Sequence, residues 1–319
     1  MKSIILTKPG LENELTYIEM PMPHAGQGEV VVKVKAFSIN PVDIKTRKGG
    51  AMYKRIQDDG PAILGWDIAG VVSSVGEGVT AFKVGDRVFG LVNFPGHGRA
   101  YAEYVAAPAS HLALQPKNIG FEAAAASTLA ALTAYQVLKK YVKSGDTVLI
   151  QAAAGGVGHF AVQIAKILGA KTLGVASGKN EAFLKTLSLD TFIDYTKKDF
   201  TTEIDEVNFA LDSQGGDVLL NSIKKVKSGG SVIAIATTMT PEIKDLASKR
   251  NVSVDFQLVE SNGEDMQQIA LWLESGQIKP HIDKVYGFHE IESAHQHILS
   301  GHTRGKVVVQ TPTAGNIAL

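Results

Sequence analysis

The sequence predicts an α/β protein in which a β-rich region is interrupted by a doubly wound parallel sheet. Three observations carry this prediction. Short strand patterns separated by Gly and Pro turns fill residues 1–120, strands and helices alternate from Asp146 to Val259, and two further helix–strand pairs end the chain. Alternation of strands and helices favours a parallel sheet covered on both faces, whereas many short strands favour a barrel-like domain.

The first 120 residues are expected to form strands because their apolar runs are short, β-branched and bounded by turn residues. These strands are expected at Met1–Thr7, Val30–Ala36, Ile68–Val75, Arg87–Leu91 and Ala100–Pro108. One helix, rich in Ala and Leu, is expected over Phe121–Tyr141 and leads into the second region.

From Asp146 onward the apolar pattern predicts six strands with helices between them. The strands are expected at Thr147–Gln151, Thr172–Ala176, Thr191–Asp194, Val207–Leu211, Ser231–Ala236 and Val252–Val259. The helices are expected at Val157–Leu168, Asn180–Leu187, Gly216–Val226 and Thr240–Lys249.

The last fifty residues contain too few elements to form a domain alone. They are expected as helices Glu264–Ser275 and Glu290–Leu299 and strands Lys284–Phe288 and Gly305–Gln310, followed by a disordered tail, Thr311–Leu319. We expect them to complete the N-terminal sheet. The predicted domains are therefore residues 1–122 with 262–319, and residues 123–261.

The clearest motif is a glycine turn between a strand and a helix. Ala153, Gly155 and Gly158 occupy the G-x-G-x-x-G positions, with Ala in the first slot. Gly155 lets a pyrophosphate approach the backbone, Gly158 lets the helix pack on the strand, and the helix N-terminus offers free N–H groups. We therefore expect Ala154, Gly155, Gly156, Val157 and Gly158 to bind a dinucleotide; the alternative is a turn that binds nothing.

Composition excludes several classes of function. Lys plus Arg and Asp plus Glu both total 32, so no basic surface for nucleic acid or membrane is indicated. The absence of cysteine excludes disulfides, thiolate nucleophiles and cysteine-ligated zinc. No apolar run reaches the ~18 residues of a spanning helix, and the N-terminus does not read as a signal peptide. A soluble, cytoplasmic protein is the expectation.

Over nearly its whole length the chain resembles the medium-chain dehydrogenase/reductase superfamily, specifically its zinc-free, zeta-crystallin-like quinone oxidoreductase branch. The resemblance rests on the order and spacing of seven segments: Ser38–Asp43, Gly65–Gly70, Val84–Val88, Gly98–Tyr104, Leu132–Ala134, Ala152–Gly158 and Gly305–Val308. It implies a GroES-like catalytic domain split around a Rossmann domain, an oxidoreductase activity and a homodimer.

The resemblance also bears on zinc. Alcohol dehydrogenases of the superfamily hold catalytic zinc with an early Cys and a Gly-His-Glu motif, where this chain has Asp43 and Gly65-Trp66-Asp67. Tryptophan cannot ligate zinc, so we expect no metal and no Lewis acid. Alcohol oxidation is then disfavoured, and hydride transfer to a quinone, enone or enal is the expected reaction.

The end of the second strand of the dinucleotide domain predicts NADPH. NAD-preferring folds place an acid there, whereas this chain has Ser177 and Lys179, a hydroxyl and a cation suited to a 2′-phosphate. By resemblance, Tyr195 lies beside the same phosphate. The alternatives are a helix cap for Ser177 and a solvated surface charge for Lys179.

Other candidates for the cofactor site rest on resemblance or on position. By resemblance, Asn40 and Asp43 face the nicotinamide, although they also suit a simple turn. Thr133 would contact the carboxamide or bond its own backbone. Asp212 ends the fourth strand at the ligand edge of the sheet. Phe256 would flank the nicotinamide or pack in the core, and Lys306 of the closing segment completes the set.

Tyr53 is the candidate proton donor to the reduced acceptor, with water as the alternative. Two other functions stay open: a non-catalytic NADPH-binding redox sensor, and an alcohol dehydrogenase with unrecognised zinc ligands. The partner is expected to be a small electron-poor acceptor, and a homodimer interface is expected at a sheet edge near Val232–Ala236.

Overall fold

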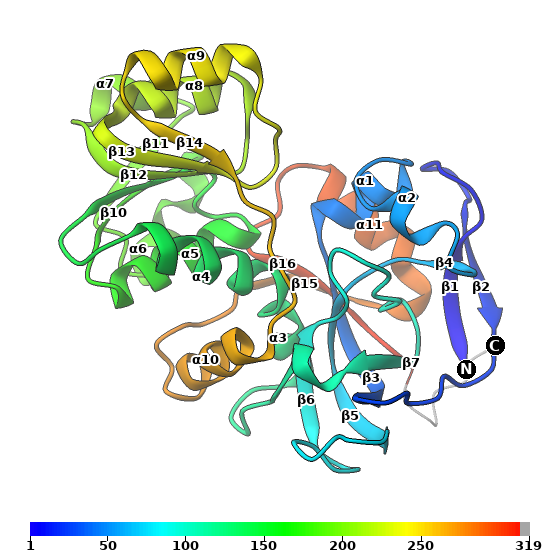
Figure 1. Cartoon of the computed structure of the whole chain (residues 1–319). Coiled ribbons are helices and arrows are strands. Elements are labelled where there is room, and N and C mark those ends of the chain that lie inside the picture. The colour runs from blue at the N-terminus through cyan, green and yellow to red at the C-terminus, as the bar shows by residue number, and fades with distance from the viewer. Residues whose placement is uncertain (313–319) are drawn as a thin grey trace. The chain divides into compact units, whose positions relative to one another are not determined.

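The structure, a computed structural model, describes residues 1–312 and divides into two compact units. The first unit consists of Met1–Leu132 and the chain from Val259 onward, and the second consists of Thr133–Leu258. The chain thus leaves the first unit once and returns to it (Figure 1). Each unit has its own sheet and its own buried core.

The first unit is built on a seven-stranded sheet with the order β15-β16-β3-β5-β6-β8, in which β7 also pairs with β3. Its strands are β3 Glu29–Ile39, β5 Asp67–Val75, β6 Arg87–Leu91, β7 Tyr104–Pro108, β8 Leu112–Leu114, β15 Ile282–Gly287 and β16 Lys306–Gln310. β16 pairs antiparallel with β3, Val307 lying opposite Ile39. The C-terminal strands therefore complete the N-terminal sheet, as the sequence predicts.

A small sheet and five helices surround this sheet. The small sheet has the order β2-β1-β4, with β1 Lys2–Leu6, β2 Leu15–Glu19 and β4 Ala62–Ile63. The helices are α1 Pro41–Arg47, α2 Tyr53–Ile56, α3 Phe121–Ala126, α10 Gly263–Glu274 and α11 Ile291–Leu299, with 3₁₀ turns η1 Ala109–His111 and η3 Phe288–Glu290. In the core, the ring of Phe37 stacks on Tyr101 with centroids 4.7 Å apart.

The second unit is a six-stranded, fully parallel sheet with the order β11-β10-β9-β12-β13-β14. Its strands are β9 Thr147–Ile150, β10 Lys171–Ala176, β11 Thr191–Asp194, β12 Val207–Asp212, β13 Val226–Ala234 and β14 Ser253–Phe256. β9 lies in the middle, and the strand order reverses beside it. Ligands of such sheets bind at the carboxyl ends of the strands around this reversal.

Helices cover both faces of the parallel sheet, which confirms the doubly wound class. They are α4 Leu129–Tyr141, α5 Gly156–Ile167, α6 Glu181–Thr186, α7 Phe200–Glu203, α8 Gly216–Lys225 and α9 Pro241–Lys249, with the 3₁₀ turn η2 Gly178–Asn180. Figure 1 shows α7–α9 on one face and α4–α6 on the other. Because both faces are covered, Val148, Leu149 and Ile150 of β9 are all fully buried.

Three sequence predictions are wrong in detail. The helix expected over Phe121–Tyr141 is two helices, because the hydroxyl of Ser127 donates to Ala123 O and that of Thr128 to Ala125 O at the break. The strand expected from Ala100 begins only at Tyr104. Val232–Ala234 lies inside the sheet between β12 and β14, so this segment is not an edge.

The predicted disordered tail lies mostly outside the described residues. Its first residue, Thr311, is an exception, because its backbone N–H donates to Lys35 O and its side chain is buried. Residues 313–319 are not described.

Candidate functional site

The turn between β9 and α5 is shaped by close backbone contacts. A Cβ atom on Gly158 would lie 2.3 Å from Ala152 O, so only glycine fits there. Ala153, in the first glycine slot, packs on β10, where a Cβ on Gly174 would come within 2.9 Å of the Ala153 Cβ. Glycine is thus required at position 158 because the first turn of α5 packs against the backbone of the turn that follows β9.

The N-terminus of α5 has no side-chain cap. Its N-cap residue is Gly155, so no side chain accepts from the first-turn N–H groups. His159, buried in the same turn, donates its Nδ1–H to Gly155 O over 2.9 Å. The ring therefore fixes the Gly155 peptide. Uncapped N–H groups and the positive end of the helix dipole are suited to an anion.

The candidate residues of the second unit come from different strands but lie along one edge of its sheet. Ala176, the last residue of β10, pairs in register with Asp194, and Asp212 pairs with Ala234, which pairs with Phe256. The carboxyl edge therefore gathers the glycine turn and five further candidates: Ser177, Lys179, Tyr195, Asp212 and Phe256. Tyr195 and Phe256 are exposed.

Asp212 presents an unsatisfied buried oxygen at this edge. Its Oδ1 accepts from the N–H groups of Gln214 and Gly215, whereas Oδ2 is buried without a hydrogen-bond partner. Burial raises the pKa of Asp212, although the two N–H groups oppose this effect. A buried oxygen without a partner is the feature that a ligand hydroxyl would complete.

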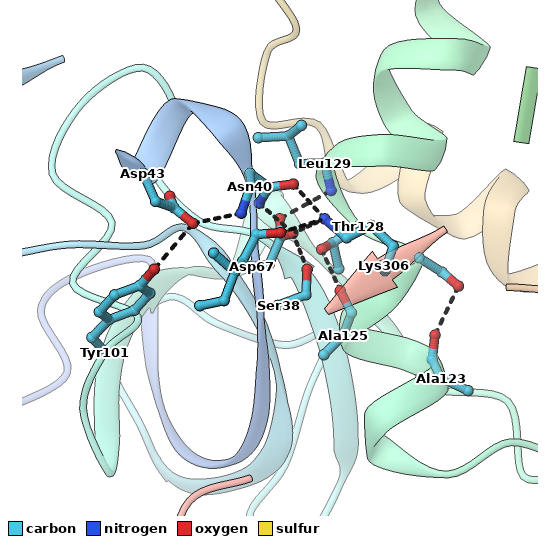
Figure 2. A network of polar contacts seen from close by, with 12 residues as sticks. Ser38, Asn40, Asp43, Asp67, Tyr101, Ala123, Ala125, Thr128, Leu129 and Lys306 are labelled. Atoms are coloured by element: carbon cyan, nitrogen blue, oxygen red, sulfur yellow. Dashed lines mark hydrogen bonds and ion pairs between the residues drawn. The ribbon is translucent and has the colours of Figure 1, made fainter. Parts of the chain in front are cut away.

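The remaining candidates lie elsewhere in the chain. Thr133 is buried in α4, at the start of the second unit. Asn40, Asp43, Lys306 and Tyr53 belong to the first unit. The first three of these lie in one buried polar network (Figure 2), whereas Tyr53 begins α2 and its ring packs partly buried against the core of that unit.

A buried ion pair lies at the centre of the network. The Lys306 ammonium is 3.6 Å from Asp67 Oδ2 and also donates to Ile39 O and Asn40 Oδ1. Asp67 accepts from Ser38 Oγ, Asn40 Nδ2 and Leu129 N. Burial lowers the pKa of Lys306, and the two carboxylates nearby oppose this shift.

A second branch runs from Asn40 through Asp43 to the buried Arg47, whose guanidinium pairs with the partly exposed Glu292. Asp43 Oδ2 accepts from Asn40 N over 2.7 Å and from the Tyr101 hydroxyl over 3.2 Å. Tyr101 OH also lies 2.9 Å from His295 Nε2, and His295 Nδ1 lies 3.2 Å from Arg47 Nη1. Because arginine can only donate, Nδ1 accepts and the imidazole proton lies on Nε2. Every bond of this branch therefore points toward Asp43.

The branch leaves Asp43 partly satisfied. Its Oδ1 is buried without a partner. Burial raises the pKa of Asp43 to about 7, helped by Asp67 and opposed by the Asn40 N–H, Lys306 and Tyr101. Sequence reasoning missed Tyr101, Arg47 and His295. No motif links them, since the fold alone brings α1, α11 and the segment before β7 together.

Residues 1–312 contain neither a cluster of metal-binding side chains nor a helix suited to span a membrane. Within that range no group of three or more His, Asp or Glu side chains is arranged to hold a metal ion. None of the helices in the same range is both long and apolar enough to cross a membrane.

Sequence comparison places known domains on both units. Residues 26–117 match the alcohol dehydrogenase GroES-like domain, and residues 187–309 match the zinc-binding dehydrogenase family. The chain is 36% identical to 2-methylene-furan-3-one reductase of Solanum lycopersicum, over 90% of this chain and 73% of the relative. It is 33% identical to NADPH-dependent alkenal/one oxidoreductase, chloroplastic, of Arabidopsis thaliana, with the same coverage.

Comparison with solved structures supports the same family as the sequence comparison. The quinone oxidoreductase from Coxiella burnetii superposes with a TM-score of 0.92 at 34% identity, covering 98% of this chain and 99% of the other. The fold is thus a GroES-like domain joined to a Rossmann-type sheet. The chain belongs to the medium-chain dehydrogenase/reductase superfamily, in its quinone oxidoreductase branch.

The shifted pKa values of two buried groups in the network predict opposing effects of pH on the free energy of unfolding. Asp43, with its pKa raised from about 3.9 to about 7, contributes stability that is lost as the pH rises toward 7. His295 has its pKa lowered by burial to about 3, so it contributes stability that is lost as the pH falls below about 6.5. Between about pH 4 and 6.5 the two slopes oppose each other.

The substitution Asp43→Asn removes the pH dependence of stability that is due to Asp43 and leaves the one that is due to His295. The free energy of unfolding of the variant should rise with pH by about 1.4 kcal/mol per unit, relative to wild type, between pH 4.5 and 6. Guanidinium unfolding followed by tryptophan fluorescence measures this difference, with Asp245→Asn on the surface of α9 as the matched control. Parallel curves for wild type and Asp43→Asn would contradict the assignment.

Proposed function

We propose that this protein is an NADPH-dependent oxidoreductase that transfers hydride to a quinone or an α,β-unsaturated carbonyl compound without zinc. The observation that carries the proposal is the turn between β9 and α5, because it joins close-packed glycines to an uncapped helix N-terminus. The names of the relatives, a furanone reductase, an alkenal/one oxidoreductase and a quinone oxidoreductase, support the acceptor class.

The residues of the second unit fit a nicotinamide dinucleotide. Gly155–Gly158 and the first turn of α5 would hold the pyrophosphate, since the glycines pack closely and the helix begins without a side-chain cap. Asp212, at the carboxyl end of β12, would lie beside the bound cofactor. When bound, the dinucleotide supplies the hydride, and the chain supplies position and charge. Thr133 and Phe256 stay predictions for the nicotinamide end.

The end of β10 supports NADPH over NADH. Ser177 and Lys179 follow the strand where an acid would select NADH. Asn180 Nδ2 donates to Ser177 Oγ over 3.1 Å, which orients the hydroxyl. The exposed Tyr195 follows the neighbouring strand β11. The name of the Arabidopsis relative specifies NADPH. We assign Ser177, Lys179 and Tyr195 to the 2′-phosphate.

The side chains at the positions of the zinc ligands do not suit zinc. The indole of Trp66 has no lone pair to offer and donates its N–H to Gly96 O over 2.7 Å. Asp67 is neutralised by the Lys306 ammonium, and Asp43 accepts from Asn40 and Tyr101. Thiolate ligands are absent because the chain has no cysteine. The proposed reaction therefore involves no metal.

Without a Lewis acid, an electron-poor acceptor is the suitable substrate. A quinone or enone accepts hydride at carbon and passes the negative charge to its oxygen, which then takes a proton. Tyr53 is our candidate donor, with water as the alternative. Asn40, Asp43 and Lys306, proposed to lie on the nicotinamide side, keep their positions through the buried network.

The organisation of the protein in the cell is also a proposal. We propose a cytoplasmic homodimer with domains at residues 1–122 with 262–319 and at residues 123–261. Support for the dimer comes from the resemblance and from β14. This strand ends the order of the parallel sheet on one side.

The function predicts NADPH oxidation only with electron-poor acceptors. Absorbance at 340 nm should fall when NADPH is mixed with the protein and a quinone, enone or enal, and not with simple ketones or aldehydes. NADH should support a lower kcat/KM. If the protein binds NADPH but turns over none of these acceptors, the result would instead support the alternative of a non-catalytic NADPH-binding redox sensor.

Tyr53→Phe tests the proton donor. Loss of the hydroxyl should lower kcat by about 100-fold or more, since positioned acid catalysis contributes about 10²–10⁴-fold. Stability should change little, because the ring that packs on the core is kept. Tyr104→Phe, at a half-buried tyrosine of β7 in the same unit to which no role is assigned, is the matched control for kcat. Unchanged kcat in Tyr53→Phe would remove this tyrosine and leave water as the donor.

A further inference from the structure

Asp194 places an acid beside the turn that ends β10. It is the last residue of β11 and lies in register with Ala176, the last residue of β10. Strand β10 therefore ends without an acidic residue, whereas the neighbouring strand β11 provides Asp194 at the same level of the sheet. This carboxylate has no role in the functions assigned above.

The carboxylate of Asp194 is fixed by three donors. Its Oδ1 accepts from Gly178 N over 2.9 Å, Thr196 N over 3.1 Å and Thr196 Oγ1 over 2.7 Å. These bonds, led by the Thr196 hydroxyl, lower the pKa of Asp194 and keep it ionised. Three donors thus hold one oxygen of this carboxylate in a fixed position.

The same carboxylate sets the shape of the turn. A Cβ on Gly178 would lie 2.4 Å from Asp194 Oδ2, so a side chain there would displace the carboxylate from its donors. Gly178 lies between Ser177 and Lys179, the two residues assigned to the 2′-phosphate. The bond from Gly178 N to Asp194 therefore holds the Ser177–Gly178 peptide inside this turn.

The charge of Asp194 also acts on a second lysine, Lys197. Lys197 Nζ lies 3.6 Å from Asp194 Oδ2, and its side chain is 77% exposed, whereas that of Asp194 is 13% exposed. A long, exposed ammonium is held weakly by such a pair and can move to a stronger anion. A phosphate near Ser177 would offer this anion, while the fixed carboxylate would repel it.

We propose that Asp194 determines how strongly this chain selects NADPH over NADH. Its carboxylate anchors the Ser177–Lys179 turn, and its negative charge competes with a 2′-phosphate for Lys197. The inference rests on the proposed use of NADPH. Asp194 is a positioning residue, because it acts on the phosphate site through Gly178 and Lys197.

Binding of fragments to the full chain separates the two effects. Isothermal titration with 2′,5′-ADP and with 5′-AMP would be carried out on wild type, Asp194→Asn and Asp194→Ala. Asn keeps an oxygen for the Gly178 N–H but loses the charge, so 2′,5′-ADP should bind about 2- to 5-fold tighter, with 5′-AMP unchanged. Ala loses the anchor as well, so it should bind 2′,5′-ADP about 2- to 10-fold more weakly than the Asn variant.

Lys197 and Lys198 provide a matched pair of variants that tests the effect of the Asp194 charge. Lys197→Gln should weaken binding of 2′,5′-ADP, whereas Lys198→Gln should not, because Lys198 is engaged with Glu203 over 2.7 Å. The ratio of kcat/KM for NADPH over NADH should follow the same order. Thermal unfolding of each variant verifies that the fold is kept.

The outcomes distinguish this inference from the proposed function. If wild type prefers 2′,5′-ADP but Asp194→Asn binds it no tighter, the role of Asp194 is wrong and NADPH use stands. If Asp194→Asn weakens both fragments equally, the acid supports the fold or binds ribose, and the inference is overturned. If wild type binds both fragments equally, the proposed NADPH preference and the inference both fail.

Discussion

The buried ion pair between Lys306 and Asp67 is the interaction on which the polar interior of the first unit depends. Both side chains are almost completely buried, and together they bind the closing strand β16 to the ends of β3 and β5. Removing one partner of such a pair leaves an uncompensated buried charge, which typically costs about 3–5 kcal/mol. Asn40 and Ser38 are hydrogen-bonded to the same carboxylate, so the Asn40–Asp43 segment keeps its position through the pair.

This arrangement also explains the expected chemistry. In the first unit the chain places its own ammonium beside Asp67 and an indole at position 66, so neither position offers a ligand to a divalent cation. The second unit has a different character, because α5 begins without a side-chain cap and a buried oxygen of Asp212 lacks a hydrogen-bond partner. Under the proposed function, this unit would hold the dinucleotide and the acceptor would need no metal.

Much of the fold follows from local patterns in the sequence. The alternation of strands and helices after Asp146 predicted all six parallel strands, and the glycine spacing identified the turn before α5 because Gly158 has room for no other residue. The helix break at Ser127 was missed because hydroxyls that bond their own backbone leave no mark on helical periodicity. The inward position of β13 was missed because strand order depends on crossovers that no single strand encodes.

The candidate site was predictable only where it lies within one motif. Asn40 and Asp43 stand three residues apart, and their bond follows from that spacing. Tyr101, His295 and Arg47 join Asp43 from distant parts of the chain, and their partners are defined by the fold. The sequence identifies Asp194 only as the end of a predicted strand. Its contact with the neighbouring turn could not be predicted, because that contact depends on the register of β10 against β11.

The central claim is that the chain reduces an electron-poor acceptor with NADPH and without zinc. Zinc content and NADPH oxidation, measured on the same untagged preparation before and after dialysis against a chelator, test it most directly. The expected result is an unchanged rate with a quinone or enone in protein that holds far less than one zinc per chain. A rate that disappears on chelation and returns with added zinc would contradict the claim.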